Sequence, residues 1–149
     1  MMIWRPNVTV AAIIERDRHF LFVEERVDGH LVLNQPAGHL EEGESLVDAV
    51  ARETLEETAF HFTPDAVIGV YRWRNPRNGT TYLRFAFTGP LMAHESGRAL
   101  DHGIERTVWL TADELAICPE RHRSPQVARC VADYLGGTRY PLSLLHDVL

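Results

Sequence analysis

The sequence predicts a mixed α/β domain in which helices pack on a sheet. Short apolar, strand-like runs alternate with helical segments along the chain, and an Asn-Gly turn joins two of the runs into a hairpin. The 149 residues, of which 45% are hydrophobic and 24% charged, are enough to bury one core. We therefore expect a single domain that spans residues 1–149.

Three strands are expected before the first helix. Residues 8–14 and 19–24 are apolar, β-branched or aromatic runs separated by a charged turn, which predicts that they pair with each other. Residues 31–34 form a short third strand, and Pro36 then ends regular structure. Ser45 opens an S-x-x-D sequence that resembles a capping box, so a helix should begin there.

The second half of the chain should begin with a hairpin. Residues 66–74 and 80–88 flank the turn sequence NPRNG, and the second strand contains three alternating apolar residues that should face the core: Leu83, Phe85 and Phe87. Residues 106–110 form a further strand. A second capping box, TADE at 111–114, opens a short helix, and Ser124-Pro125 opens a helix that ends near Leu135.

Composition excludes several classes of function. A net charge of −6 argues against nucleic-acid binding through a broad basic surface. No apolar run approaches the length of a membrane span and no signal peptide is recognisable, so we expect a cytoplasmic protein, and a monomer. Cys118 and Cys130 lack CxxC spacing, which argues against zinc.

The expected helix after Ser45 carries carboxylates where its buried face should be. At about 100° per residue, Glu53 and Glu57 continue the face of Leu46 and Val50, and Glu56 lies at its edge. Like charges three and four residues apart repel, and the C-terminal end of a helix disfavours anions. A solvated helix gains nothing from this arrangement.

A divalent cation would neutralise these carboxylates. Arg52 can pair with Glu56, but one cation cannot balance three converging glutamates together with Glu44 at the other end of the helix. Carboxylate ligands select hard cations, so the sequence predicts a Mg²⁺ site, with Mn²⁺ as a substitute. Because Mg²⁺ sites of this kind bind substrate phosphates, the ligand should be a small nucleotide or pyrophosphate.

The hairpin supplies the candidate substrate contacts. It carries four arginines and no acid between residues 71 and 84, and we expect them to form the wall that faces the phosphates: Arg72, Arg74, Arg77 and Arg84. Arg84 shares strand parity with Tyr82, so a cation and an aromatic ring could meet a heterocyclic diphosphate together. Trp73 and Gln35 are further candidates for substrate binding.

The glutamates belong to a larger pattern. Residues 38–60 fit the spacing G-x5-E-x7-R-E-x2-E-E, which is the Nudix box, and the chain resembles the Nudix hydrolase superfamily in this box, in length and in element order. Segments outside the box, including residues 34–41 and 123–125, resemble a bacterial phosphatase of that superfamily. The resemblance implies an α/β/α sandwich, Mg²⁺ dependence, and release of the terminal phosphate from nucleoside di- and triphosphates and thiamine-related pyrophosphates.

The resemblance also implies residue roles. Glu56 and Glu57 would be metal ligands, Glu53 a ligand or the base for the attacking water, and Arg52 an orienter of the glutamates. Glu44 would be a structural carboxylate, and the main-chain carbonyl of Ala37 or Gly38 would complete the ligand set. Many members use a further acid before the last strand, for which we favour Asp101 over Glu105.

Two positions depart from the family pattern. Ala59 replaces a glycine after the box helix, where positive φ makes alanine cost about 1 kcal/mol. Thr54 replaces an aliphatic residue. These changes leave the acidic ligands in place.

Three alternative functions fit the sequence less well. Hydrolysis of ADP-ribose or a dinucleoside polyphosphate would need a more extended recognition surface, for which this short chain offers little. A catalytically silent nucleotide sensor should have lost acidic box residues, but all are present. A structural calcium module would need a D-x-D-x-D-G loop, which the sequence lacks.

Overall fold

The structure is a computed structural model that describes residues 1–148. The strands are β1 Asn7–Ala12, β2 Glu15–Arg16, β3 His19–Val27, β4 His30–Asn34, β5 Ala37–His39, β6 Phe60–Phe62, β7 Ala66–Arg74, β8 Thr81–Thr88, β9 Leu91–His94, β10 Ile104–Thr111 and β11 Tyr140–Pro141. The helices are α1 Leu46–Thr58, α2 Ala112–Ala116 and α3 Gln126–Leu135, with 3₁₀ turns η1 Pro119–Arg121 and η2 Leu142–Leu144. None of the described helices is long and apolar enough to cross a membrane.

The strands form a mixed sheet and two smaller antiparallel ones. The largest sheet has the order β11-β7-β8-β1-β5, in which β1 runs parallel to β8 and the other neighbours are antiparallel. A second sheet has the order β10-β3-β2, with β4 paired to β3, and β6 pairs with β9. The predicted mixed α/β architecture is therefore confirmed.

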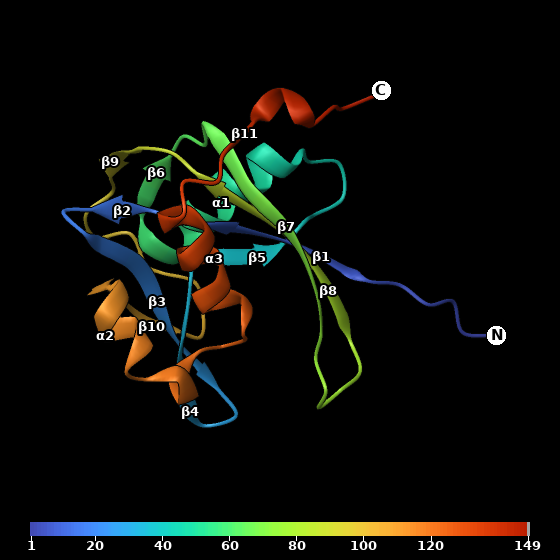
Figure 1. Ribbon diagram of the computed structural model, residues 1–149, viewed down its shortest axis with the longest axis horizontal. Helices are drawn as coiled ribbons and strands as arrows, with labels where there is room; N and C mark the ends of the chain where they lie inside the picture. Colours follow the sequence, from blue (N-terminus) through green and yellow to red (C-terminus); the bar gives the residue numbers. More distant parts are fainter. Residues whose placement is uncertain (149) are drawn as a thin grey trace.

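Helices α1 and α3 cover opposite faces of the strands (Figure 1). On one side, Ala49 and Val50 of α1 pack against Val10 and Phe87. On the other side, Val127 of α3 belongs to a cluster around Ile13, Phe22 and Ala86. Strand β8 thus contributes Ala86 to one core and Phe87 to the other, which is the layering of the predicted α/β/α sandwich.

The predicted pairing of the first two strands is wrong. Both edges of β1 are occupied, by β8 and β5, so it lies inside the large sheet rather than beside β3. The hairpin instead joins β3 to the two-residue β2 through a turn in which Asp17 and Arg18 have φ of 52° and 65°. One hydrogen bond of 2.9 Å, from the N–H of Leu21 to the carbonyl of Ile14, links the two predicted runs.

The hairpin of β7 and β8 is confirmed, with a difference in burial. The N–H of Asn75 donates to the carbonyl of Thr80 across the turn, at 2.8 Å. Of the three predicted core residues on β8, Phe87 is fully buried, whereas Leu83 and Phe85 are half-buried. The opposite face of the strand is also covered, so Arg84 is only 4% exposed.

The predicted helix starts are close to those observed. Ser45 caps α1 by accepting a hydrogen bond from the N–H of Asp48 at 3.0 Å, and Thr111 forms a complete capping box at α2. Helix α3 begins one residue after Pro125, and the hydroxyl of Ser124 accepts from the N–H of Gln126 at 3.2 Å. Helix α1 ends at Ala59, which has the expected positive φ, 64°.

Candidate active site

The box glutamates lie where α1 faces an open cleft. Glu53 and Glu57 are one turn apart on the buried face of the helix, and each is 8% exposed, while Glu56 is half-buried. The cleft has a volume of about 460 Å³. Its lining includes the two buried glutamates of α1, the loop before it, the β7–β8 hairpin and the segment that leads into α3.

Arg52 connects the carboxylates around it. It donates to both carboxylate oxygens of Glu44, at 2.7 and 3.0 Å, and to Glu53 at 2.9 Å. Its Nη1 also reaches Glu56 at 3.2 Å, and its Nη2 donates to the carbonyl of His39 at 3.0 Å. The hydrogen bonds from Arg52 hold the pKa of Glu44 below its usual value. The orienting role of Arg52 and the structural role of Glu44 stay predictions, which these contacts make possible.

The loop before α1 positions the two buried glutamates. A Cβ atom at Gly38 would lie 2.1 Å from the carboxyl carbon of Glu53, so only glycine leaves room for this side chain. The N–H of Ala37 donates to Glu57 Oε1 at 2.9 Å. Ala37 therefore contacts a glutamate through its amide, and the metal-ligand role predicted for its carbonyl stays a prediction.

The buried carboxylates lack a full complement of positive charge. Burial raises the pKa of Glu57 to about 9, and the negative charges of Glu25, Glu53 and Asp101 add to this effect. Burial also raises the pKa of Glu53 to about 7, against the opposing influence of Arg52. Shifts of this kind are typical of carboxylates at functional sites, where a neighbouring cation would favour the charged form.

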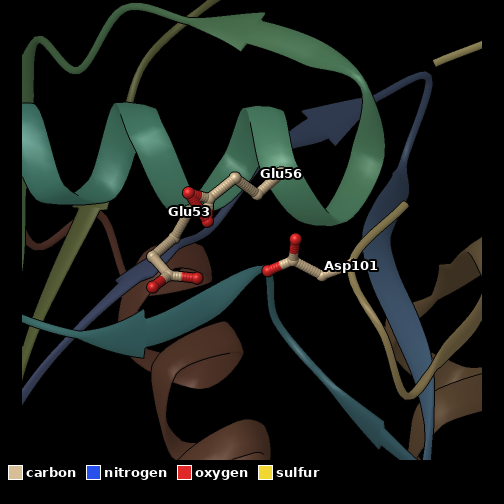
Figure 2. Close-up of side chains that lie close together, drawn as sticks. All are labelled: Glu53, Glu56 and Asp101. Atoms are coloured by element: carbon tan, nitrogen blue, oxygen red, sulfur yellow. The ribbon is translucent and has the colours of Figure 1, made fainter. Parts of the chain in front are cut away.

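Three carboxylates converge on one point beside α1. One oxygen each from Glu53, Glu56 and Asp101 lies within 4.8 Å of the others, and Figure 2 shows the three side chains directed toward a common space. Asp101 comes from the loop between β9 and β10, and its N–H donates to the carbonyl of Glu56 at 3.0 Å. An all-carboxylate cluster of this size fits a hard divalent cation.

The structure separates the two candidates for the additional acid. Asp101 belongs to the carboxylate cluster. Glu105 points elsewhere and forms an ion pair of 3.0 Å with Arg26, in which both side chains are about half exposed. Of the two, only Asp101 lies where it could assist the box glutamates.

The predicted substrate residues divide into two groups. Arg84, Trp73 and Tyr82 line the cleft, and the rings of Trp73 and Tyr82 stack with a centroid distance of 5.9 Å. Gln35 and Arg74 do not line it. Gln35 is 1% exposed, because its amide nitrogen donates to the carbonyl of Val127 and its oxygen accepts from Arg84.

The predicted wall of four arginines is therefore wrong. Arg72 and Arg74 alternate with Tyr71 and Trp73 along β7, so they project from the other face of the strand and are exposed. Arg77 lies in the exposed turn and does not line the cleft. Arg84 alone of the four lines the cleft, and its Nη1 and Nη2 already donate to side-chain oxygens of Gln35 and Asn34.

The cleft also contains residues that were not predicted to belong to the site, among them Glu25, Arg123 and Ser124. Glu25 lines the cleft and raises the pKa of Glu57, while Arg123 and Ser124 enter it from the segment before α3. Two consecutive glutamates at the end of an apolar strand were the available signal for Glu25. For Arg123 and Ser124 the available signal was the resemblance of residues 123–125 to a Nudix phosphatase. That resemblance does not show that they approach the box, which depends on how α3 packs.

The departures from the box pattern leave the site intact. Thr54 is fully buried, and its hydroxyl donates to the carbonyl of Val50 at 2.7 Å, which satisfies the polar atom within the helix. Ala59 adopts the left-handed conformation expected of glycine, and it is 3% exposed. Burial of its methyl group, worth about 0.8 kcal/mol, offsets much of the cost of positive φ.

Comparisons with known proteins agree with this geometry. The chain matches the model of the NUDIX domain over residues 4–133. It is 39% identical over 144 residues to phosphatase NudJ of Escherichia coli strain K12, a match that covers 97% of this chain and 93% of NudJ, and equally similar to NudJ of Shigella flexneri. A solved structure of a NUDIX hydrolase from Nitrosomonas europaea superposes with a TM-score of 0.94 at 49% identity, covering 97% of this chain and 98% of that one. The chain therefore belongs to the Nudix hydrolase family.

Proposed function

We propose that this protein hydrolyses phosphoanhydrides with Mg²⁺, or Mn²⁺ in its place, and releases the terminal phosphate. Its substrates would be nucleoside di- and triphosphates and thiamine-related pyrophosphates. The observation that carries the proposal is the convergence of Glu53, Glu56 and Asp101 beside a cleft that also contains the buried Glu57. Similarity to phosphatase NudJ over nearly the whole chain supports removal of a terminal phosphate rather than of pyrophosphate.

The residues of the site would have different roles in the reaction. Glu53, Glu56, Glu57 and Asp101 would hold the cation, which when bound neutralises the oxygens of the phosphoanhydride. Glu53 is either one of its ligands or the base that accepts a proton from the attacking water. Arg52 keeps three of the glutamate side chains in place through hydrogen bonds of 2.7–3.2 Å.

The organic part of the substrate would bind at the hairpin. Trp73 and Tyr82 present a stacked aromatic pair at the cleft, which suits the flat face of a nucleobase or of a pyrimidine ring. Arg84 lines the same cleft, and hydrogen bonds to Asn34 and Gln35 hold it in place. A cytoplasmic location and a monomeric state stay predictions.

Product analysis tests this proposal directly. Wild-type protein, stripped of metal and then given Mg²⁺, is incubated with nucleoside triphosphates and the products are separated by ion-exchange chromatography without added pyrophosphatase. We expect inorganic phosphate and nucleoside diphosphate together as the first products, with monophosphate and a second inorganic phosphate following. Pyrophosphate as the dominant early product would overturn the phosphatase proposal and leave the Nudix fold standing.

Two variants show whether the activity comes from this site. We expect Glu53→Gln and Glu57→Gln each to lower kcat at least 100-fold, about 2.7 kcal/mol, while circular dichroism stays native. Glutamine keeps the shape of the side chain and removes the negative charge that binds a cation. Near-wild-type turnover by both variants would show that the carboxylate cluster is not the catalytic site.

A further inference from the structure

The two arginines of the cleft differ in how the described part of the chain holds them. The charged lining of the cleft consists of four carboxylates and two guanidinium groups: Glu25, Glu41, Glu53, Glu57, Arg84 and Arg123. Arg84 is buried and donates to two amide side chains. Arg123 is exposed, and among residues 1–148 its side chain makes no ion pair or hydrogen bond.

The main chain at Arg123 is nevertheless firmly placed. Its N–H donates to the carbonyl of the buried Leu33 at 2.8 Å, and a β-bridge joins Leu33 to His122. The next residue, Ser124, is 7% exposed, and its hydroxyl accepts a hydrogen bond of 3.2 Å from the N–H of Gln126, the first residue of α3. The Cα atom of Arg123 is thus fixed at the cleft, while its guanidinium is available to a ligand.

Arg123 stands apart from the carboxylate cluster. No described carboxylate lies within 4.0 Å of its guanidinium, whereas Arg52 serves the box glutamates. Two further features favour an anion on this wall. The positive end of the α3 dipole faces the cleft through Ser124 and Gln126, and the buried Nε of Arg84 has no hydrogen-bond partner among the described residues.

These positions suit a chain of two or more phosphates. The attacked phosphate must meet the carboxylate cluster and its cation, and a neighbouring phosphate then needs a separate positive partner. We propose that Arg123 binds the phosphate that remains with the organic product, and so selects the terminal phosphate for attack. This inference rests on the proposed function and names the residue that decides which phosphorus reacts.

Product inhibition distinguishes the two phosphates. The substrate is the nucleoside diphosphate that wild type hydrolyses best, because it has one anhydride and yields one monophosphate and one inorganic phosphate. For Arg123→Gln we expect KM and the inhibition constant of the nucleoside monophosphate to rise at least tenfold. The inhibition constant of inorganic phosphate and kcat should change less than threefold. Arg123→Lys should fall between wild type and glutamine.

Arg129→Gln provides the matched control. Arg129 is an exposed arginine of α3, the helix that follows Arg123. It pairs with Asp133 at 2.9 Å and lies outside the cleft, so its loss should leave all four constants unchanged. An equal effect in both variants would mean that only net charge matters, and would overturn the inference. Thermal melting checks that both variants fold.

Other outcomes also decide the question. A weaker inhibition by inorganic phosphate alone would place Arg123 on the attacked phosphate, and unchanged constants would leave it without a role in binding; either result overturns the inference. If wild type releases no phosphate, the proposed function fails. Calorimetric titration of wild type and Arg123→Gln with the monophosphate then still tests Arg123, and equal affinities, or no binding to either, would refute the inference.

Discussion

At the scale of single residues, the buried glutamates differ in what stabilises their charges. A buried carboxylate costs free energy unless a cation or hydrogen-bond donors face it. Glu53 has Arg52 at 2.9 Å, whereas the described contact of Glu57 is the N–H of Ala37. The pKa of Glu57 is accordingly raised further, to about 9, than that of Glu53, to about 7. The charge of Glu57 is therefore the less well compensated of the two.

Gly38 allows Glu53 to reach its position. In the variant Gly38→Ala, a Cβ 2.1 Å from the Glu53 carboxyl carbon must push that side chain out of the carboxylate cluster. We expect kcat to fall at least 100-fold, the effect of losing the carboxylate itself. Steady-state phosphate release with Mg²⁺ measures this loss.

Gly136→Ala is the control for the glycine substitution. Gly136 has φ of −70°, and the nearest atom to a Cβ there is 3.4 Å away, so alanine fits with little adjustment. Its activity should equal that of wild type. Full activity of Gly38→Ala would show that Glu53 can be displaced without consequence, which contradicts the role given to it here.

At the scale of elements, the active site depends on how α1 is held at both ends. Ser45 caps its first turn, and Ala59 ends it in the left-handed conformation. Between these ends the helix places apolar and acidic side chains on one face, so the apolar part packs in the core while the acidic part lines the cleft. Packing of the apolar side chains thus fixes the position of α1, and α1 in turn fixes the positions of its carboxylates.

Removing the N-cap hydroxyl of Ser45 should lower the free energy of unfolding but leave turnover nearly unchanged. For Ser45→Ala we expect a loss of about 1 kcal/mol in the free energy of unfolding, because the N–H of Asp48 loses its side-chain partner. Turnover at 25 °C should stay within threefold of wild type, since the glutamates lie in later turns. Urea denaturation and kinetics measure the two quantities.

Ser96→Ala serves as the comparison for the cap. Ser96 is exposed in a turn, and a substitution there should change stability by less than about 0.5 kcal/mol. If both serine variants were equally stable, the hydrogen bond at the start of α1 would contribute nothing measurable.

At the scale of the whole molecule, local patterns predicted more than long-range contacts. The box helix and the β7–β8 hairpin follow from periodicity and turn residues within short segments, and both are confirmed. The pairing of β1 could not be predicted in this way, because its partner β8 lies about 75 positions away and runs parallel to it. The sequence alone gave no reason for β8 to be covered on both faces.

In the candidate site, too, features set by a short segment were predicted and features set by long-range contacts were not. The glutamates of α1 were predicted because one helix contains them. The choice between Asp101 and Glu105 depends on the path of a loop, and the burial of Arg84 depends on Asn34 and Gln35 nearly fifty residues earlier. Arg123 was missed because it approaches the cleft only once α3 has packed against the sheet.

One buried carboxylate joins several of these distant parts. Glu24 of β3 is 4% exposed and accepts hydrogen bonds from Arg106 of β10 and from Arg121 of η1, the latter at 2.6 Å. Burial alone would raise the pKa of Glu24, but the two arginines hold it below its ordinary value of 4.5. Glu24 thereby ties the second sheet to the segment that carries Arg123 toward the cleft.

The depressed pKa of Glu24 predicts how its contribution depends on pH. A carboxylate whose pKa is lower in the folded state stabilises the protein above its unfolded pKa, near 4.5, and this stabilisation is lost as the pH falls through the folded value. Glu24→Gln should therefore reduce the free energy of unfolding by about 2 kcal/mol at pH 7. The difference from wild type should shrink steadily below pH 4.5.

Urea denaturation of wild type and Glu24→Gln between pH 7 and pH 3 measures this difference, and comparing the two proteins cancels the titration of the other carboxylates. Glu15→Gln is the control, because Glu15 is exposed and accepts a single hydrogen bond of 3.1 Å from Tyr134, so its difference should be small at every pH. A Glu24→Gln difference that stays constant down to pH 3 would mean that shape, and not charge, holds the two arginines. In that case the pairing of Glu24 with Arg106 and Arg121 would not be what joins the second sheet to the cleft.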